Sequence, residues 1–318
     1  MKNMVLQVLS SGCDTLDLLM NGGLPVGAPS LIFGIPNLGK TWMCFQFACQ
    51  CTRSVAKGGL GRPSLYLDTE SFFTPDVFER IYSYFRRRWP DLPKEPMVEV
   101  IRIKDIFQLG NIFGMEMVIK QEESRVSAMV KFPTGRQIKI ADTKARKSGG
   151  SREIKKTLQS SAWQKNSEIW KKYEEKNYGF LVMDSITIPV KSVIPKGTQH
   201  LPGRGSLLAP LLGALYPLTI NFKSAALVTD HITRSPLSPT YRYGYGNPWG
   251  GDDVKYYIKY QFGLFPGLKA DRESMDEGHR IRRVQRYRYP GLDGTMSSIY
   301  LGKNQGYIDI PAGRTRDL

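Results

Sequence analysis

A short turn between two apolar segments carries the residue types that hold phosphate. The apolar run SLIF at 30–33 is followed by GIPNLGKT, which fits the pattern G-x-x-x-x-G-K-[ST], and then by a helix-compatible stretch. In such a turn backbone N–H groups converge on phosphate oxygens, Lys40 reaches the β- and γ-phosphates, and the Thr41 hydroxyl ligates Mg²⁺. An accidental glycine turn beside a surface lysine is the alternative, which the flanking strand and helix patterns disfavour. The residues predicted to surround a bound ATP are Gly34, Ile35, Pro36, Asn37, Leu38, Gly39, Lys40, Thr41 and Trp42.

Two carboxylates follow other apolar runs and could complete a phosphoryl-transfer site. Asp184 ends the run FLVMD, where a second Mg²⁺ ligand beside Thr41 is expected. Glu70 lies just past the run SLYLD, where it could accept a proton from water. A single aspartate at a strand end is structural about as often as functional, but the order of all three motifs along the chain favours function. We therefore predict that Lys40 and Glu70 are catalytic and that Thr41 and Asp184 bind the metal.

Five short apolar runs alternate with segments of helical character, and this order predicts the fold class. Near-continuous apolar strands are typical of a parallel sheet covered on both faces, and TPDVFERIYSYFRRRW at 74–89 has the pattern of a covering helix. We therefore expect an α/β fold with a central, mostly parallel sheet flanked by helices. Three of the runs end in aspartate, at the strand ends where open α/β sheets bind ligands. The runs lie at 30–33, 64–68, 98–103, 180–184 and 225–230.

A segment from about residue 115 to 150 interrupts this pattern. It alternates apolar and polar residues, turns at PTG and ends in a basic stretch closed by glycines, which predicts a small antiparallel β-rich insertion followed by a flexible arm. A polar helix over SAWQKNSEIWKKYEEKN, at 161–177, is expected to lead back to the sheet. No internal repeat is visible in the sequence, so we expect residues 1–318 to form one domain that carries this insertion.

The charge balance indicates a polyanionic partner. The chain has 318 residues, a formal net charge of +16 and a pI of about 9.6, which favours nucleic acid over an acidic small substrate, with a solvated positive face as the simple alternative.

The first residues turn polar too soon for a signal peptide, and no apolar run reaches the roughly 20 residues of a membrane span, so we expect a cytoplasmic protein. The four cysteines lack paired C-x-x-C spacing, which disfavours a metal site and predicts buried thiols.

Several motifs occur in an order that one family of ATPases shares. The opening LSSGCDTLDLLMNGGLPVGAPSLIFGIPNLGKT is followed by YLDTESFFTP, LVMDSIT, GRGSLL, NPWGG and IYLGKNQGYID. These segments resemble the RecA/RadA recombinase superfamily, and within it the archaeal RadA paralogs and RadB-like proteins, over residues 9–110 and 178–310. The resemblance implies a RecA-like P-loop ATPase core that uses ATP and Mg²⁺, with Glu70 activating the attacking water.

The chain departs from the pattern of this family at two places. Where the family has Thr-Asn-Gln, whose glutamine senses the γ-phosphate, this chain has Thr229, Asp230 and His231. An imidazole can also donate a hydrogen bond to phosphate, so His231 is a candidate for the catalytic sensor position. The arginines that stack on adenine in the family are replaced by Thr74 and Val77.

Two loops are candidates for binding single-stranded DNA. In the family they lie near GRGSLL and before NPWGG, and here they combine basic and aromatic residues with glycine and proline. Bases stack on aromatic rings while cations contact phosphates, and the alternatives are packing on a neighbouring subunit or plain solvation. The predicted DNA-binding residues are Lys196, Arg204, Arg234, Tyr241, Arg242, Tyr243 and Tyr245. Two other stretches, KARKSGGSREIKK and the alternating Arg280, Arg282, Arg286 and Arg288, form either further phosphate contacts or solvated basic surface.

Three functions follow from these residues and from the resemblance. The first, which the resemblance implies, is an ATP-binding, DNA-stimulated ATPase of homologous recombination and DNA repair, a RadA paralog that acts as a homo- or hetero-oligomer with a RadA-type recombinase as candidate partner. The second is a slow or inactive ATPase that serves as a nucleotide-gated accessory protein binding DNA or a recombinase. The third is a KaiC-like regulatory ATPase without DNA, which the basic aromatic loop and the net charge disfavour.

Overall fold

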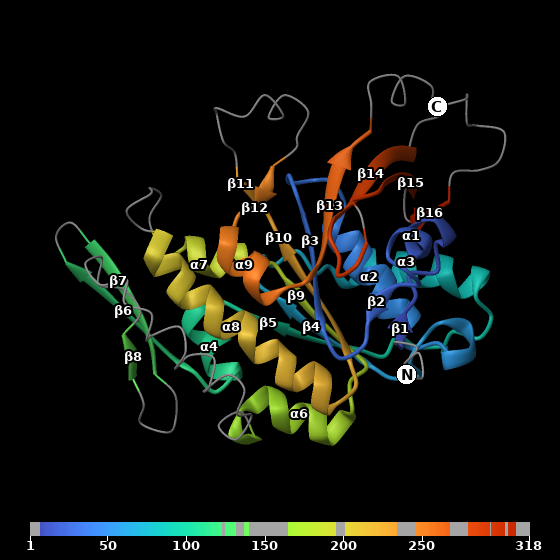
Figure 1. Cartoon of the computed structure of the whole chain (residues 1–318). Coiled ribbons are helices and arrows are strands. Elements are labelled where there is room, and N and C mark those ends of the chain that lie inside the picture. The colour runs from blue at the N-terminus through green and yellow to red at the C-terminus, as the bar shows by residue number, and fades with distance from the viewer. Residues whose placement is uncertain are drawn as a thin grey trace, which may run out of the picture.

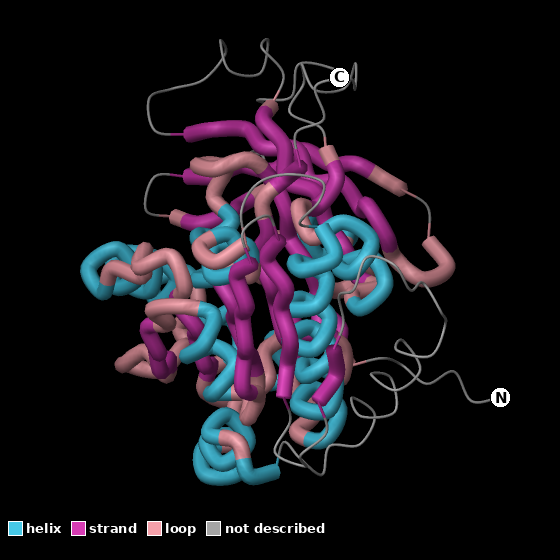
Figure 2. Tube along the Cα trace, turned by 90° about the vertical axis from the view of Figure 1, so that its left-hand side faces the viewer, coloured by secondary structure: helices cyan, strands magenta, loops and turns pink. Residues whose placement is uncertain are grey.

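One nine-stranded sheet with helices on both sides forms the centre of the protein (Figure 1; Figure 2). No helix in the described part of the chain combines the length and the apolar composition that a membrane crossing needs. The computed structural model describes residues 7–122, 125–131, 137–139, 165–194, 201–233, 246–267, 279–292, 294–302 and 305–309.

The sheet has a parallel part, and three antiparallel strands extend one edge of it. Its order is β16-β15-β14-β13-β3-β10-β9-β4-β5, and all neighbouring pairs from β13 to β5 run parallel. All five apolar runs predicted as strands lie in the parallel part, which confirms the expected fold class. The strands are β3 (Pro29–Gly34), β4 (Ser64–Asp68), β5 (Val98–Arg102), β9 (Phe180–Asp184), β10 (Ala225–Asp230), β13 (Tyr260–Pro266), β14 (His279–Arg288), β15 (Met296–Gly302) and β16 (Gly306–Ile308).

Helices cover both faces of the sheet, so each strand serves two hydrophobic layers. In β3, Ile32 packs toward one layer while Leu31 and Phe33 pack toward the other. The layer of Ile32 contains α1 (Asp14–Leu19), α2 (Lys40–Cys51) and α3 (Pro75–Arg88). The opposite layer contains α4 (Ile106–Ile112), α6 (Glu168–Lys176), α7 (Thr187–Lys191), α8 (Leu201–Asn221) and α9 (Gly251–Tyr257).

The amphipathic helix predicted from TPDVFERIYSYFRRRW is confirmed as α3. Pro75 suits its first turn, because the N–H that proline lacks would have no helical partner there. The buried residues are Phe78, Ile81, Tyr82 and Phe85, whose spacing of i, i+3, i+4 and i+7 places them on one side of the helix. The opposite side of α3 therefore faces solvent.

The insertion folds as the alternation of its residues predicts. Its strands β6 (Glu116–Glu122), β7 (Arg125–Lys131) and β8 (Gln137–Lys139) form a three-stranded antiparallel sheet. Met117 and Val130 are buried in the layer of α4 and α8, which fastens the small sheet to the core. Figure 1 shows it at the edge of the molecule beside α4 and α8. The predicted basic arm at 140–150 lies outside the described residues.

The predicted polar helix is present as α6, and it is amphipathic. It begins at Glu168, after Ser167, whose Oγ accepts a hydrogen bond from the backbone N–H of Trp170. Ile169, Trp170 and Tyr173 are buried in the core. Residues 161–164 of the predicted helix lie outside the described part.

Two short antiparallel pairs and a 3₁₀ turn are the remaining elements of the core. Strand β1 (Val8–Leu9) pairs with β2 (Leu24–Pro25), and the 3₁₀ turn covers Val55–Lys57. Strand β11 (Ile232–Thr233) pairs with β12 (Asn247–Pro248). The second of these pairs joins the two flanks of the second predicted DNA loop.

Candidate nucleotide site and adjoining loops

The glycine-rich turn lies between β3 and α2, as predicted. Asn37 and Gly39 have φ angles of +63° and +99°. A Cβ atom on Gly39 would lie 2.7 Å from the Tyr307 hydroxyl, and one on Gly34 would lie 2.5 Å from the Leu264 carbonyl oxygen. Glycine is therefore required at both positions of the motif, because any side chain would displace the turn.

Lys40 lies under the turn with its ammonium group held by the backbone. Its Nζ donates hydrogen bonds to the carbonyl oxygens of Gly34, at 3.0 Å, and Ile35, at 3.1 Å. Burial lowers the pKa of Lys40, while the charges of Asp184 and Glu70 act in the opposite direction. A lysine ammonium has three N–H donors, so one remains for a ligand in the turn.

Asp184 and Thr41 meet at the ends of β9 and α2, as the sequence predicts for a metal site. The Thr41 hydroxyl donates to Asp184 Oδ2 at 2.7 Å. Tyr66 donates to the same oxygen at 2.7 Å, and Thr229 donates to Oδ1 at 2.5 Å. Burial raises the pKa of the Asp184 carboxyl, and hydrogen bonds from Thr229, Tyr66 and Thr41 oppose that shift.

The donor set of this site fits Mg²⁺. Mg²⁺ prefers oxygen ligands and commonly takes one or two from the protein, with water and phosphate oxygens completing its coordination. Thr41 and Asp184 offer a hydroxyl and a carboxylate in contact with each other. Among the described residues no cluster of three or more His, Cys, Asp or Glu side chains could hold a metal by protein ligands alone.

Glu70 lies at the same edge of the sheet and receives two hydrogen bonds. The Ser185 hydroxyl donates to Glu70 Oε1, and His231 Nε2 lies 3.1 Å from the same oxygen. Burial alone would raise the pKa of Glu70, but the hydrogen bonds from His231 and Ser185 and the charges of His231 and Lys40 outweigh it, so the pKa lies below its ordinary value. The structure thus brings together Lys40, Glu70 and His231, the three predicted catalytic residues.

The loop that carries Glu70 is folded around the carboxylate of Asp68. Asp68 Oδ1 accepts hydrogen bonds from the backbone N–H groups of Glu70, at 3.3 Å, and Phe72, at 3.2 Å, and its Oδ2 accepts one from Phe73 at 3.1 Å. Ser71 has a φ angle of +57°, which completes this tight turn. Phe73 is buried, whereas Glu70 faces the nucleotide turn.

Asp230 joins the site to the closure of the second loop. Its carboxylate accepts hydrogen bonds from the Thr187 hydroxyl, from the backbone N–H of His231 at 2.8 Å and from that of Gly250 at 3.1 Å. The backbone N–H of Trp249 donates to the His231 carbonyl oxygen at 2.8 Å. Burial raises the pKa of Asp230, and these hydrogen bonds oppose the shift.

Of the seven predicted DNA-binding residues, Arg204 lies in the described part of the chain. Its guanidinium carbon is 4.9 Å from the centre of the Trp249 ring, and Lys191 Nζ is 5.0 Å from the same centre. The flanks of the two predicted loops therefore touch through this ring. The other six lie outside the described residues: Lys196, Arg234, Tyr241, Arg242, Tyr243 and Tyr245.

The basic strand β14 is used for internal contacts. Arg282 Nε donates to the Leu38 carbonyl oxygen in the nucleotide turn at 3.1 Å, and Arg286 Nε donates to the Leu19 carbonyl oxygen at 2.8 Å. Both arginines lie on one side of the strand, as their spacing predicts. That side faces the protein, so these two residues do not form a free phosphate-binding surface.

The sequence predicts the main carboxylates of the site but not the hydroxyl groups that donate hydrogen bonds to them. Tyr66 and Thr229 hold Asp184, and Ser185 holds Glu70. The one local signal was that Ser185 directly follows Asp184. The four cysteines, by contrast, are all free and buried as predicted.

Comparison with known proteins agrees with this arrangement. The Rad51 family model matches residues 2–101. The chain is 30% identical over 129 residues to "DNA repair protein RAD51 homolog 4" of Bos taurus, a match that covers 39% of this chain and 37% of the relative. It is 41% identical over 79 residues to "DNA repair protein Rad51 homolog" of Drosophila melanogaster, covering 24% of this chain and 23% of the relative.

An archaeal protein is also similar. The chain is 35% identical over 69 residues to "DNA repair and recombination protein RadA" of Cenarchaeum symbiosum (strain A), covering 22% of this chain and 17% of the relative. The matched segments thus span less than two fifths of each of these three curated relatives. The sheet order and the grouping of Lys40, Glu70 and Asp184 at the strand ends agree with these similarities. The chain is thus similar to the Rad51 family over residues 2–101, and through it to the RecA/RadA recombinase superfamily.

Proposed function

We propose that the protein binds Mg²⁺ and ATP and hydrolyses the ATP, and that DNA stimulates this reaction in homologous recombination and DNA repair. One observation carries the proposal. The lysine of the phosphate-binding turn, a hydroxyl–carboxylate pair suited to Mg²⁺ and a hydrogen-bonded glutamate lie together at the carboxyl ends of β3, β4 and β9. The carboxyl ends of strands in an open α/β sheet are the usual place for such a ligand.

The residues of the turn would hold ATP, and the pair beside it would hold the metal. The backbone N–H groups of the turn and the amino end of α2 would contact the phosphates, and the Lys40 ammonium would add a positive charge. Mg²⁺, when bound by Thr41 and Asp184, would supply positive charge to the phosphate oxygens. The three hydroxyl groups on Asp184 orient its carboxylate before any ligand arrives.

Glu70 would orient the attacking water and accept its proton. A pKa below the ordinary value keeps the Glu70 carboxylate ionised at neutral pH, so it is available as a base. Ser185 and His231 fix the orientation of this carboxylate through Oε1 and leave Oε2 for water. His231 is also the candidate sensor of the γ-phosphate, because it lies at the end of β10 beside Glu70.

Single-stranded DNA would contact the two loops that meet at Trp249. Arg204 and Lys191 at the flank of the first loop and Trp249 at the end of the second offer two cations and a ring. Asp230 and the backbone of His231 join that junction to Glu70. This connection supports coupling between DNA and ATP turnover in a RadA paralog that works in the cytoplasm, as an oligomer or with a RadA-type recombinase.

One observation favours a second function, that of a nucleotide-gated accessory protein. Glu70 Oε1 is already engaged by Ser185 and by His231. Hydrogen bonds that stabilise a carboxylate also reduce its basicity, which would slow proton transfer from water. In that case ATP binding would switch the affinity for DNA or a recombinase with little turnover.

ATP hydrolysis by the wild type and by Lys40→Ala, each with and without single-stranded DNA at low and moderate salt, tests both functions. Lys171→Ala is the matched control, since it removes an exposed lysine on α6. Turnover that rises with DNA and disappears only in Lys40→Ala supports the DNA-stimulated ATPase. Negligible turnover together with salt-sensitive, ATP-dependent DNA binding would replace it by the accessory protein.

A further inference from the structure

A pocket lies on the solvent side of α3. It has a volume of about 590 Å³, within the range of about 300 to 1,000 Å³ that is usual for small-ligand sites. Its walls come mainly from α3 and from the turn between β15 and β16. The lining residues used below are Asp76, Glu79, Arg80, Tyr84, Arg87 and Gln305.

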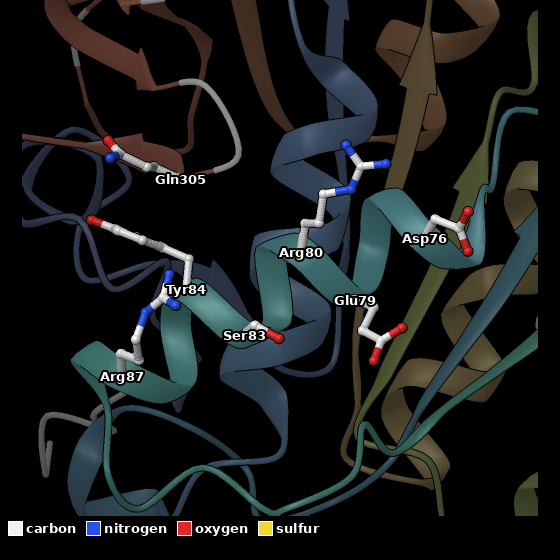
Figure 3. Close-up of a pocket in the computed structure, with 7 residues that line it drawn as sticks. All are labelled: Asp76, Glu79, Arg80, Ser83, Tyr84, Arg87 and Gln305. Carbon is white, nitrogen blue, oxygen red and sulfur yellow. The ribbon is translucent and has the colours of Figure 1, made fainter.

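Two arginines and a tyrosine form a stripe along this pocket. Arg80, Tyr84 and Arg87 are spaced i, i+4 and i+7, which places them on one side of α3. Figure 3 shows Arg80 and Tyr84 rising from the same side of the helix, with Arg87 beside Tyr84 and Gln305 across from the ring. An aromatic ring flanked by two guanidinium groups is the combination that takes a base on the ring and phosphates on the cations.

The other polar groups of the pocket suit the edge of a nucleobase. Gln305 offers an amide, which can donate and accept hydrogen bonds, and the carboxylates of Asp76 and Glu79 can accept hydrogen bonds from exocyclic amino groups. The acidic residues lie at the amino end of α3, whereas the arginines continue toward its carboxyl end. The phosphates of a bound strand would therefore lie toward Arg87.

The helix dipole explains part of this charge pattern but not the stripe. Acidic residues in the first turn and basic residues in the last stabilise any helix, which accounts for Asp76 and for Arg86–Arg88. Arg80 lies in the middle of α3, where the dipole has little effect. Within the described residues neither Arg80 nor Arg87 forms an ion pair with a carboxylate. Their guanidinium groups are thus available to an anionic ligand.

We propose that this pocket binds single-stranded nucleic acid, with one base on Tyr84 and the adjoining phosphates on Arg80 and Arg87. The site is separate from the junction at Trp249, since α3 lies on the opposite side of the molecule from α7 and α9 in Figure 1. Its occupation requires neither ATP nor hydrolysis. The strand would thus be held at a second point, away from the two loops.

Photocrosslinking of the full chain to an oligonucleotide that carries 5-iododeoxyuridine tests the placement directly. Tyr84 is expected among the crosslinked residues, with or without ATP and also in Lys40→Ala. Crosslinks confined to the loops around 195–200 and 234–245 would overturn the proposal. Crosslinking of Tyr84 to an azido-ATP but not to the oligonucleotide would also overturn it, because the pocket would then belong to the ATP site.

Binding of a fluorescent oligonucleotide to paired variants separates this site from general charge. Arg80→Ala/Arg87→Ala is expected to weaken binding by about tenfold or more and to reduce the steepness of the salt dependence. Tyr84→Leu is expected to weaken it about fivefold to a hundredfold, and Tyr84→Phe should retain it. Lys165→Ala/Lys171→Ala removes the same charge from another surface and should have little effect. Equal losses in the two double variants would overturn the proposal.

Failure of this proposal and failure of the proposed ATPase give different results. The double variant Arg80→Ala/Arg87→Ala is expected to keep the ATP turnover that the wild type shows without DNA. Lys40→Ala is expected to lose turnover but to keep the contact at Tyr84. Loss of DNA-free turnover in the arginine variant, with unchanged oligonucleotide binding, would assign the pocket to ATP and overturn the second strand site.

Discussion

The hydrogen bonds on the carboxylate of Glu70 have two opposite effects on its use as a base. Ser185 and His231 hold it by hydrogen bonds, which fixes its direction and keeps it ionised, but the same bonds reduce its basicity. His231 lies at the end of β10, where its backbone is held by Asp230 and Trp249. His231 therefore connects the Glu70 carboxylate to the closure of the second loop.

Replacement of His231 should change the pH dependence of ATP turnover. The pKa of Glu70 lies below its ordinary value, so turnover is expected to hold as the pH falls and to decline only near the lowered pKa. In His231→Ala the hydrogen bond is lost, the pKa of Glu70 rises, and the decline should begin at a higher pH. We also expect kcat to fall by roughly tenfold or more.

The measurement is the rate of ATP hydrolysis between pH 4 and pH 8, with His231→Gln as control. Glutamine keeps an N–H donor, so its acidic limb should lie near that of the wild type. An acidic limb at the same pH in His231→Ala and in the wild type would contradict the role given to this hydrogen bond.

The two carboxylates could be predicted from sequence, but the hydroxyl groups around them could not. Asp184 and Glu70 follow apolar runs, which is a local pattern. Tyr66 lies within a run of strand residues, and its partner depends on the register of β4 against β9, where Asp68 faces Asp184. Register is set by long-range pairing, which a local pattern does not contain.

At the scale of elements, the nucleotide turn is held by strands from the far end of the chain. The Leu38 carbonyl oxygen accepts hydrogen bonds from Arg282 Nε at 3.1 Å and from the Tyr307 hydroxyl at 2.9 Å. The amide of Gln46 donates to the Ser11 carbonyl oxygen at 2.8 Å and to that of Tyr307 at 2.9 Å, and it accepts from the Tyr307 N–H. These bonds fasten β16 to the turn and to α2.

Substitution of Gly39 by alanine should separate backbone strain from loss of the site. Gly39 has a φ of +99° and no room for a Cβ, whereas Gly27 has a φ of +89° and no atom within 4 Å of such a Cβ. We expect both Gly39→Ala and Gly27→Ala to lower the free energy of unfolding by about 1 to 2 kcal/mol. Only Gly39→Ala should also weaken binding of a fluorescent ATP analogue, by about tenfold or more.

Urea unfolding and titration with the analogue measure the two effects. Gly39→Ala that binds the analogue as tightly as Gly27→Ala would show that contact with Tyr307 does not set the shape of the turn.

Helix α6 is attached to the edge strand β5 through Glu99. Its carboxylate lies 2.6 Å from Lys172 Nζ and 2.6 Å from Lys176 Nζ, and it accepts a hydrogen bond from Tyr178. Burial alone would raise the pKa of Glu99, but these partners lower it from 4.5 to about 2. The stabilisation is therefore complete above pH 4.5 and is lost as the pH falls toward 2.

Glu99→Gln should lower the free energy of unfolding by about 1 to 2 kcal/mol at pH 7, and the difference from wild type should shrink as the pH falls below 4.5. Urea unfolding at pH 7 and pH 3 gives the two values. Glu95→Gln, an exposed substitution with the same change of charge, is the control. A difference that grows on acidification would contradict the attachment through an ionised Glu99.

The character of α6 illustrates the limit of a local pattern. Ile169, Trp170 and Tyr173 occupy one side of a helix that is otherwise charged. Lysines and glutamates outnumber these three residues in the segment, so the sequence predicts a polar helix. The three apolar side chains nevertheless suffice to bury one side, because α6 covers only the end of the sheet (Figure 1).

At the scale of the whole molecule, five of the six parallel strands could be predicted because each is a short apolar run between helical segments, whereas the order in which they pair could not. The antiparallel extension by β14 and β15 is less visible, since arginine alternates through β14. Alternating arginines suggest an exposed basic surface, yet Arg282 and Arg286 donate hydrogen bonds to backbone carbonyl oxygens of distant segments. That one domain spans the whole chain remains a prediction.

The burial of all four thiols gives a test of the folded core as a unit. Cys13, Cys44, Cys49 and Cys51 are buried, and burial raises the pKa of each, so few thiolates exist near neutral pH. We expect an aromatic disulfide reagent at pH 8 to modify none of them within minutes in the native protein, and all four in guanidinium chloride. Rapid modification of the native protein would show that the core opens locally.

The bonds between the nucleotide turn and the last strands bear on how the protein is made. During translation, the glycine-rich turn and the strands of Glu70 and Asp184 leave the ribosome before β14 and β16. Until Arg282 and Tyr307 emerge, the Leu38 carbonyl oxygen lacks both of its donors and Gln46 lacks one of its anchors. A nascent chain therefore cannot complete the hydrogen bonds around the glycine-rich turn until Arg282 and Tyr307 have been synthesised.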